Sequence, residues 1–238
     1  MGGLMSVTPD PAPPHIRTFH PRRGRMGARH ADALDTAWPR YGLTVADDDD
    51  TAIRPAELFG RTAPVVLEIG FGMGDATAQM AAADPGRDYL AIEVHTPGVA
   101  NLLALVAERG LGNVRVARGD ALVLLGRLAP DSLDAVHVFF PDPWPKARHH
   151  KRRLVQEAHL AAIAGRLRPG GTLHCATDWP HYAEAMRAAL DAQPLLRGGV
   201  VPRPAARPVT KFERRGVAAG RPITDLVYHR TGTTDAAD

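Results

Sequence analysis

The chain has 238 residues, of which 45% are apolar, and its 29 lysines and arginines against 26 acidic residues give a formal net charge of only +3. This length and composition fit one large globular domain with extensions. The single cysteine, Cys175, excludes a disulfide scaffold and a cysteine-rich zinc cluster. No 18-residue apolar run and no apolar N-terminal segment occur, so we expect a cytoplasmic protein without a membrane span.

Residues 1–60 differ in pattern from the rest of the chain. Four prolines lie between residues 9 and 14, and the stretch shows no sustained periodicity, so we expect a flexible extension. Its basic part, residues 15–30, contains no acid but five arginines: Arg17, Arg22, Arg23, Arg25 and Arg29. This stretch is either a mobile tail or an arm that docks on nucleic acid.

Strand and helix patterns alternate from residue 64 onward. The apolar runs predict strands at 65–69, 89–94, 114–117, 133–140 and 172–177, with further strands near 195–201 and 223–229. Helical spacing predicts helices at 75–83, 97–109, 121–128, 151–167 and 180–191. This alternation indicates an α/β domain over residues 61–230, with a doubly wound, mostly parallel, seven-stranded sheet, followed by a disordered tail at 231–238. Ligands of such sheets bind outside the carboxyl ends of the strands.

A glycine-rich turn follows the first predicted strand. Glu68 precedes the G-x-G-x-G run at Gly70, Gly72 and Gly74. A dinucleotide site favours G-x-G-x-x-G, whereas an acid before G-x-G-x-G is typical of S-adenosylmethionine (SAM) methyltransferases. The carboxylate suits the ammonium group of SAM, and the alternative interpretation is a tight turn without a ligand.

Acidic residues also end the next two strands. Glu93 is placed to accept hydrogen bonds from ribose hydroxyls, and Asp120 to accept one from an adenine amino group. Each acid alone is also explained as a solvated strand end. Three such signals at successive strand ends together predict a SAM site.

The exit of the fourth strand carries the most specific segment, Phe139–Lys146, which reads FFPDPWPK. Its prolines stiffen the chain around Asp142 and Lys146, and Trp144 offers a ring for stacking a base or packing a loop. Cations follow up to Arg153, at the start of the predicted helix 151–167. Because cations oppose the dipole of a helix N-terminus, we expect phosphates to bind there.

Two later segments complete the candidate set. Asp178 ends the fifth strand, and the sequence Asp178–Trp179–Pro180 is also typical of a helix N-cap. Residues 209–216 are polar and charged, and physical reasoning alone allows a surface loop. The residues show no metal-ligand spacing, so we expect no metal site.

The sequence resembles the bacterial tRNA (guanine-N7-)-methyltransferase family in EIGFGMG at 68–74, IEVH at 92–95, FPDPWPK at 140–146 and TKFE at 210–213. The resemblance implies a Rossmann-like class I enzyme that transfers a methyl group from SAM to N7 of a variable-loop guanosine in tRNA. It implies that SAM is bound by Glu68, Gly70, Glu93, Asp120 and Asp142, of which Asp142 is also catalytic. Substrate contacts are implied for Lys146, Asp178, Thr210, Lys211, Phe212 and Glu213, and RNA contacts for Arg148, His149, His150, Lys151, Arg152 and Arg153.

Three other functions stay open on the sequence. One is an amino-methyltransferase acting on another nucleic-acid base, although Asp142-Pro143-Trp144 lacks the second consecutive proline of that class. Another is a non-catalytic RNA-binding protein with a SAM fold, and the third is a dinucleotide oxidoreductase. We expect tRNA as the partner and no obligatory protein partner, with monomer or homodimer left open.

Overall fold

A computed structural model describes residues 18–19 and 26–232. Arg17, Arg22, Arg23 and Arg25 of the predicted basic arm lie outside the described residues, as do residues 233–238 of the predicted tail. Within the described part of the chain, no helix combines the length and apolar character that crossing a membrane requires.

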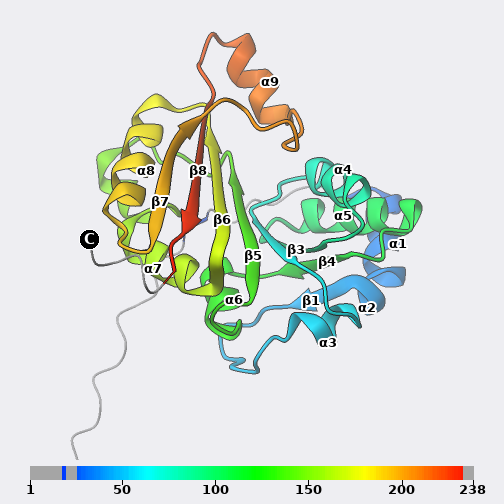
Figure 1. The fold of residues 1–238 in the computed structure, drawn as a ribbon. Coiled ribbons are helices and arrows are strands. Elements are labelled where there is room, and N and C mark those ends of the chain that lie inside the picture. Colours follow the sequence, from blue (N-terminus) through cyan, green and yellow to red (C-terminus); the bar gives the residue numbers. More distant parts are fainter. Residues whose placement is uncertain (1–17, 20–25, 233–238) are drawn as a thin grey trace, which may run out of the picture.

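One eight-stranded sheet forms the centre of the molecule, in the order β1-β4-β3-β2-β5-β6-β8-β7 (Figure 1). The pairings from β1 to β6 are parallel, and β8 is antiparallel to both β6 and β7. The strands are β1 (Gly42–Thr44), β2 (Val65–Ile69), β3 (Asp88–Glu93), β4 (Val114–Arg118), β5 (Leu133–Phe139), β6 (Leu167–Thr177), β7 (Leu196–Val201) and β8 (Thr224–Arg230).

Helices cover both faces of this sheet, which explains why its central strands are almost continuously apolar. One face packs against α1 (Ala28–Thr36), α2 (Trp38–Tyr41), α4 (Asp75–Ala83) and α5 (Thr96–Arg109). The other packs against α3 (Pro55–Phe59), α6 (Ala121–Arg127), α7 (Glu157–Arg166) and α8 (Pro180–Ala192). Helix α9 (Lys211–Ala218) lies at the edge where the parallel strands end (Figure 1), and the 3-10 helix η1 (Ala147–Arg152) follows β5 along the chain.

The order of the strands creates a crevice between β2 and β5. From β2 the chain builds outward through β3 and β4, and then it crosses over to β5 and β6 on the other side. The loops that leave β2 and β5 therefore diverge to opposite faces. Such a switch point is where doubly wound sheets bind ligands.

The predicted α/β class with a mostly parallel sheet is confirmed, and so are most element positions; α4 spans the predicted residues 75–83. The sheet has eight strands rather than seven because Gly42–Thr44, which we assigned to the extension, pairs with β4. The division at 1–60, 61–230 and 231–238 stays a prediction, but described residues between 28 and 59 contribute three helices and this strand.

Three predicted elements were wrong in their bounds or type. The helix expected at 151–167 begins only at Glu157, and the strand expected from residue 172 begins at Leu167 and runs through Pro169-Gly170-Gly171. The cations before residue 154 therefore precede α7 and lie on or beside the short 3-10 helix η1, so the argument from the dipole of a helix over 151–167 does not apply. The segment at 209–216, which we allowed as a loop, contains most of α9.

Candidate functional site

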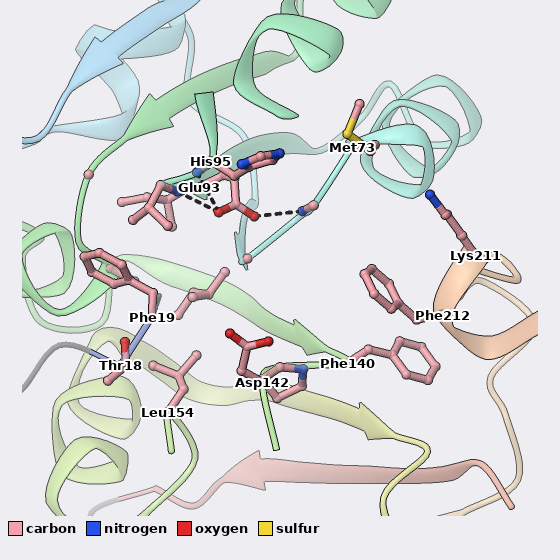
Figure 2. A pocket seen from close by; sticks show the side chains of 18 of the residues that line it. Thr18, Phe19, Met73, Glu93, His95, Phe140, Asp142, Leu154, Lys211 and Phe212 are labelled. Carbon is pink, nitrogen blue, oxygen red and sulfur yellow. Dashed lines mark hydrogen bonds between the residues drawn. The ribbon is translucent and has the colours of Figure 1, made fainter. Parts of the chain in front are cut away.

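A pocket of about 340 Å³ opens at the carboxyl ends of β2, β3 and β5. Its wall combines the glycine loop after β2, the ends of β3 and β5, one face of α9 and the two described residues Thr18 and Phe19. In Figure 2, Glu93 and Asp142 point into the cavity from opposite walls, and Lys211 and Phe212 approach it from α9. The predicted strand-end site is therefore a real concavity.

The glycine loop needs glycine for conformation and for close packing. Gly70 and Gly72 adopt φ of 75° and 63°, in the left-handed region that side chains avoid. A Cβ on Gly98 at the start of α5 would lie 1.9 Å from the carbonyl oxygen of Gly72. The loop and α5 thus fit together closely, while a Cβ on Gly70 would meet nothing within 4 Å. Gly70 leaves this part of the pocket wall open.

Glu93 holds the pocket wall beside β3. Its Oε2 accepts a hydrogen bond from the Gly72 N–H at 3.0 Å, and its Oε1 accepts from the N–H groups of Val94 and His95 at 2.7 and 3.0 Å (Figure 2). The carboxylate therefore ties the glycine loop to the β3 exit while lining the cavity.

Glu68 lies behind the glycine loop, does not line the pocket, and is only 3% exposed. Among the described residues its Oε2 has no hydrogen-bond partner. Burial raises the pKa of Glu68 to about 7; the Thr77 hydroxyl acts against this rise, and the negative charge of Glu93 adds a smaller part to it. A buried, unpartnered carboxylate oxygen under a ligand loop suits a cationic or donor group that arrives with the ligand.

Asp120 caps a helix and does not line the pocket. Its Oδ1 accepts from the Leu122 N–H at 2.8 Å, which satisfies a free donor at the start of α6. Its chain neighbours Gly119 and Ala121 do line the pocket. The predicted adenine contact by Asp120 stays a prediction.

The loop after β5 brings Phe140 and Asp142 to the pocket and turns Trp144 away from it. Trp144 is 9% exposed, its indole N–H donates to the Thr18 carbonyl at 3.3 Å, and the Arg152 guanidinium lies 4.0 Å from its ring centroid. Of the two roles that the sequence allowed for Trp144, the structure gives it loop packing.

The six basic residues predicted to contact RNA fall into different environments. Arg148, His150 and Lys151 on η1 are exposed, and so is Lys146 before it. His149 is half-buried against the edge of the Trp144 ring. Arg152 is half-buried and donates to the carbonyl of Phe19 at 2.8 Å.

Arg153 is buried, in contrast to its neighbours on η1. It donates to the Pro143 carbonyl at 2.9 Å and covers the Tyr182 ring. Its contacts are those of a residue that fixes the loop after β5.

Asp178 lies outside the pocket lining, and its carboxylate does not cap α8. Trp179 is the N-cap of α8, and the Asp178 Oδ2 instead accepts two hydrogen bonds from Arg221 at 2.7 and 2.9 Å. The N-cap predicted for Asp178 is therefore wrong, because a partner distant in sequence takes its carboxylate. Asp178 packs against Gly216 of α9: a Cβ added to Gly216 would lie 2.8 Å from the Cβ of Asp178.

Helix α9 carries predicted substrate residues with two separate roles. Thr210 is its N-cap and accepts from the Glu213 N–H at 3.1 Å. Lys211 and Phe212 line the pocket. Glu213 is 7% exposed and faces away from the pocket, toward Arg207, whose Nη1 donates to its Oε2 at 2.5 Å.

Sequence reasoning missed Arg207, Arg215 and the site role of Phe140. Arg215 lines the pocket four residues after Lys211, a spacing that places both on one helix face once a helix is expected there. Arg207 is 1% exposed and bridges Glu213 and Asp225. Its partners are set by tertiary structure, so no local pattern identifies it.

Comparison with known proteins agrees with this geometry. A family described as "Putative methyltransferase" matches residues 62–226. The tRNA (guanine-N(7)-)-methyltransferase of Streptomyces avermitilis is 54% identical, and the alignment covers 95% of this chain and 80% of that one. The protein of the same name from Burkholderia vietnamiensis is 52% identical, over 90% of this chain and 85% of its own.

Solved structures match the fold at low sequence identity. The 16S rRNA methyltransferase KamB aligns with a TM-score of 0.54 and 18% identity, covering 74% of this chain and 92% of that one. The antibiotic-resistance methyltransferase Kmr aligns with the same TM-score at 16% identity, covering 77% and 96%. These likenesses show the class I methyltransferase fold alone. The high identity to the curated relatives over most of both chains shows more: the chain belongs to the tRNA (guanine-N(7)-)-methyltransferase family.

Proposed function

We propose that this protein transfers a methyl group from SAM to N7 of a guanosine in the variable loop of tRNA. The observation that carries the proposal is the meeting of Glu93 and Asp142 in one pocket beside the glycine loop, with Lys211 and Phe212 on its outer wall. The side of the pocket beside the glycine loop and Glu93, which we call the cofactor wall, and the side with Asp142, Lys211 and Phe212, which we call the acceptor wall, thus share one cavity. The names of the relatives supply the base and the atom.

The residues present fit SAM. The pocket volume of about 340 Å³ suits a ligand of that size, and the open space at Gly70 lets a ligand approach the backbone. The unpartnered Oε2 of Glu68 beneath the loop, together with the Glu93 carboxylate, matches a ligand rich in amino and hydroxyl donors. When bound, SAM supplies an electrophilic methyl group on a sulfonium centre.

Methylation of guanine N7 does not require the protein to remove a proton from the acceptor before attack. Guanine N7 carries an in-plane lone pair and no proton, so no general base is needed to create the nucleophile. The methylated ring is cationic, and a carboxylate beside it stabilises the charge that develops in the transition state. Asp142 is the pocket carboxylate at the β5 exit, and we assign it this electrostatic role.

Orientation of the base is the larger contribution. An aspartate oxygen accepts hydrogen bonds from the guanine N1–H and amino group, which fixes the base while N7 lies in line with the methyl–sulfur bond. A base in folded tRNA reaches such a pocket only after leaving its stack. Cations on η1 beside the pocket, Arg148 and Lys151 among them, are placed to hold the phosphates of a splayed loop.

The proposal is tested by methyl transfer from labelled SAM to unmodified tRNA, followed by nucleoside analysis. The expected product is 7-methylguanosine, which disappears when the variable-loop guanosine is replaced. A methylated adenine or cytosine would replace the proposed substrate by that of an amino-methyltransferase. SAM and tRNA binding without transfer would instead identify a non-catalytic RNA-binding protein. Cytoplasmic location and a monomeric or homodimeric state stay predictions.

A further inference from the structure

Two phenylalanines face one another at the α9 side of the pocket. The rings of Phe140 and Phe212 lie 20° from parallel with centroids 6.4 Å apart, and both line the cavity (Figure 2). Phe212 is 43% exposed and Phe140 is half-buried. Core phenylalanines bury their rings, whereas these two nearly parallel rings stay accessible at the wall of a ligand pocket. Such an arrangement suits a ligand with a flat face.

The backbone holds Phe140 in a conformation that a bulky residue rarely adopts. Its φ is 53°, in the left-handed region, and its N–H donates to the Ala176 carbonyl at 2.7 Å. Strained conformations of this kind persist where the surrounding structure imposes them, and they cluster at ligand sites. This turn takes the ring out of the β5 register and directs it to the pocket.

Arg207 links the Phe140 ring to the helix that carries Phe212. Its guanidinium carbon lies 5.6 Å from the Phe140 ring centroid, and its Nη1 donates to Glu213 on α9, the helix that carries Phe212. Its Nε and Nη2 donate to Asp225 on β8 at 2.7 and 2.9 Å. One buried side chain therefore fixes the ring on the β5 loop and the helix of the other ring to the same strand of the sheet.

A nucleobase can stack on these rings once Phe212 moves. Stacked bases in a nucleic-acid strand are about 3.4 Å apart, so a base between two parallel rings needs about 7 Å between the ring planes. The 6.4 Å between the centroids includes any sideways offset, so the exposed Phe212 ring moves aside when a base enters. Asp142 and Lys211 line the same cavity and offer an acceptor and a donor to the edge of such a base.

We propose that Phe140 and Phe212 form an aromatic pair that receives the flat face of the acceptor base, and that Arg207 is a positioning residue that sets this pair. The inference rests on the proposed function for the identity of the base. The resemblance implied Phe212 only as a substrate contact. The inference adds a stacking role for it, Phe140 as its partner, and Arg207 as the residue that aligns the two rings.

The test compares Phe140→Leu and Phe212→Leu with Phe140→Tyr and Phe212→Tyr in steady-state methyl transfer. Loss of base–aromatic stacking is expected to raise the KM for tRNA about tenfold or more in the leucine variants, while the tyrosine variants keep near-normal values. The dissociation constant for SAM is expected to stay unchanged in all four. Val217→Ala, an exposed apolar change on α9 outside the pocket lining, is the control.

A weakened affinity for SAM with an unchanged KM for tRNA would overturn the proposal, because the rings would then belong to the cofactor wall. An unchanged KM for tRNA in both leucine variants would overturn it as well. Wild-type protein that produces no 7-methylguanosine defeats the proposed function instead. If the wild type methylates another base, the same variants test the pair with that base.

The role of Arg207 is tested by a double-mutant cycle. Arg207→Lys is expected to raise the KM for tRNA several-fold on its own and to add little to the variant that carries both Phe140→Leu and Phe212→Leu, because both rings through which it acts are then missing. A structural effect would instead add fully to that of the double leucine variant. Such additivity would overturn the positioning role and leave the aromatic pair to its own test.

Discussion

Asp142 is the residue on which the chemistry depends most. It lines the pocket opposite Glu93, and it follows Phe140, whose φ of 53° turns the chain at the end of β5. The sequence placed Asp142 at the exit of the fourth predicted strand, between two prolines that stiffen the chain, and the resemblance implied its catalytic role. The orientation of the Asp142 side chain toward Glu93 depends on the left-handed backbone conformation of Phe140, which no sequence pattern predicts.

Replacement of Asp142 by Asn keeps the shape of the side chain and removes its charge. We expect turnover to fall at least about tenfold, because the positive charge that develops on the base loses its nearby carboxylate. Affinities for SAM and tRNA are expected to change little. Single-turnover kinetics with separate binding titrations measure both, with Asp35→Asn on the exposed side of α1 as the control. Full turnover with normal binding would contradict the assigned role.

The buried carboxyl group of Glu68 leads to a prediction about how the stability of the protein depends on pH. Burial raises its pKa from 4.5 to about 7, so between these values the folded protein holds a proton that the unfolded chain releases. Its stabilising contribution is therefore fully present below about pH 4.5 and is lost as the pH rises through about 7. Each pKa unit corresponds to about 1.4 kcal/mol, so the loss is roughly 3 kcal/mol.

Urea unfolding of the ligand-free protein and of Glu68→Gln at pH 5 and pH 8 checks this sign. The free energy of unfolding of the variant, relative to the wild type, is expected to rise by roughly 2–3 kcal/mol between the two pH values. A relative stability that is constant or falls with pH would show that Glu68 is ionised in the folded protein.

At the scale of elements, η1 and α9 explain where local sequence reasoning succeeded and where it failed. The alternation of β-branched runs and helical spacing located β2 to β6 and α4 to α8, apart from the starts of α7 and β6, because local pattern and burial agree there. It failed at 151–156, where a contact distant in sequence holds an irregular segment: the Val155 N–H donates to the Tyr182 hydroxyl at 3.1 Å. It also failed to predict α9, which Glu213 anchors to Arg207.

The exposed cations of η1 are expected to bind phosphates, whereas Arg153 supports the fold. Joint replacement of Arg148 and Lys151 by alanine should weaken tRNA binding and lower the slope of its salt dependence by about 1 to 2, because two phosphate contacts are lost. The measurement is tRNA binding across a salt series. Joint replacement of Arg54 and Arg187, two exposed arginines on α3's N-cap and α8, is the charge-matched control. If both pairs of replacements weaken tRNA binding equally, the cations of η1 contribute only to the net charge of the protein and do not form specific phosphate contacts.

The buried cluster under α9 makes a stability prediction with an internal control. Arg203 and Arg207 both contact Glu213. The Arg203 side chain is 41% exposed and its Nε lies 3.6 Å from Oε1 of Glu213, whereas the Arg207 side chain is 1% exposed and its Nη1 lies 2.5 Å from Oε2. Lysine cannot replace the planar fork that binds two carboxylates. Arg207→Lys is therefore expected to cost about 3 kcal/mol of unfolding free energy, and Arg203→Lys less than about 1 kcal/mol. Similar costs in denaturant titrations would show that the cluster is not an anchor.

At the scale of the whole molecule, the doubly wound sheet decides which residues meet. Parallel strands end at one edge, so signals at 68–74, 93 and 142, distant along the chain, gather at the β2/β5 switch point. This much follows from the sequence pattern. Helix α9 forms one wall of the site, and β8, which follows it, pairs with β6. Buried ion pairs join Arg207 to α9 and to β8, and these pairs have no periodic signature in the sequence.

The central claim is that the methyl group goes to one ring atom, N7, of one guanosine. The most direct test places 7-deazaguanosine, which has a C–H group where guanosine has N7, at the variable-loop position of an otherwise unmodified tRNA. Transfer from labelled SAM is measured together with tRNA binding. We predict normal binding and no transfer to the substituted tRNA, with full transfer to the guanosine-containing control. Undiminished transfer to the 7-deazaguanosine tRNA would contradict the account, because the methyl group would then go to another atom.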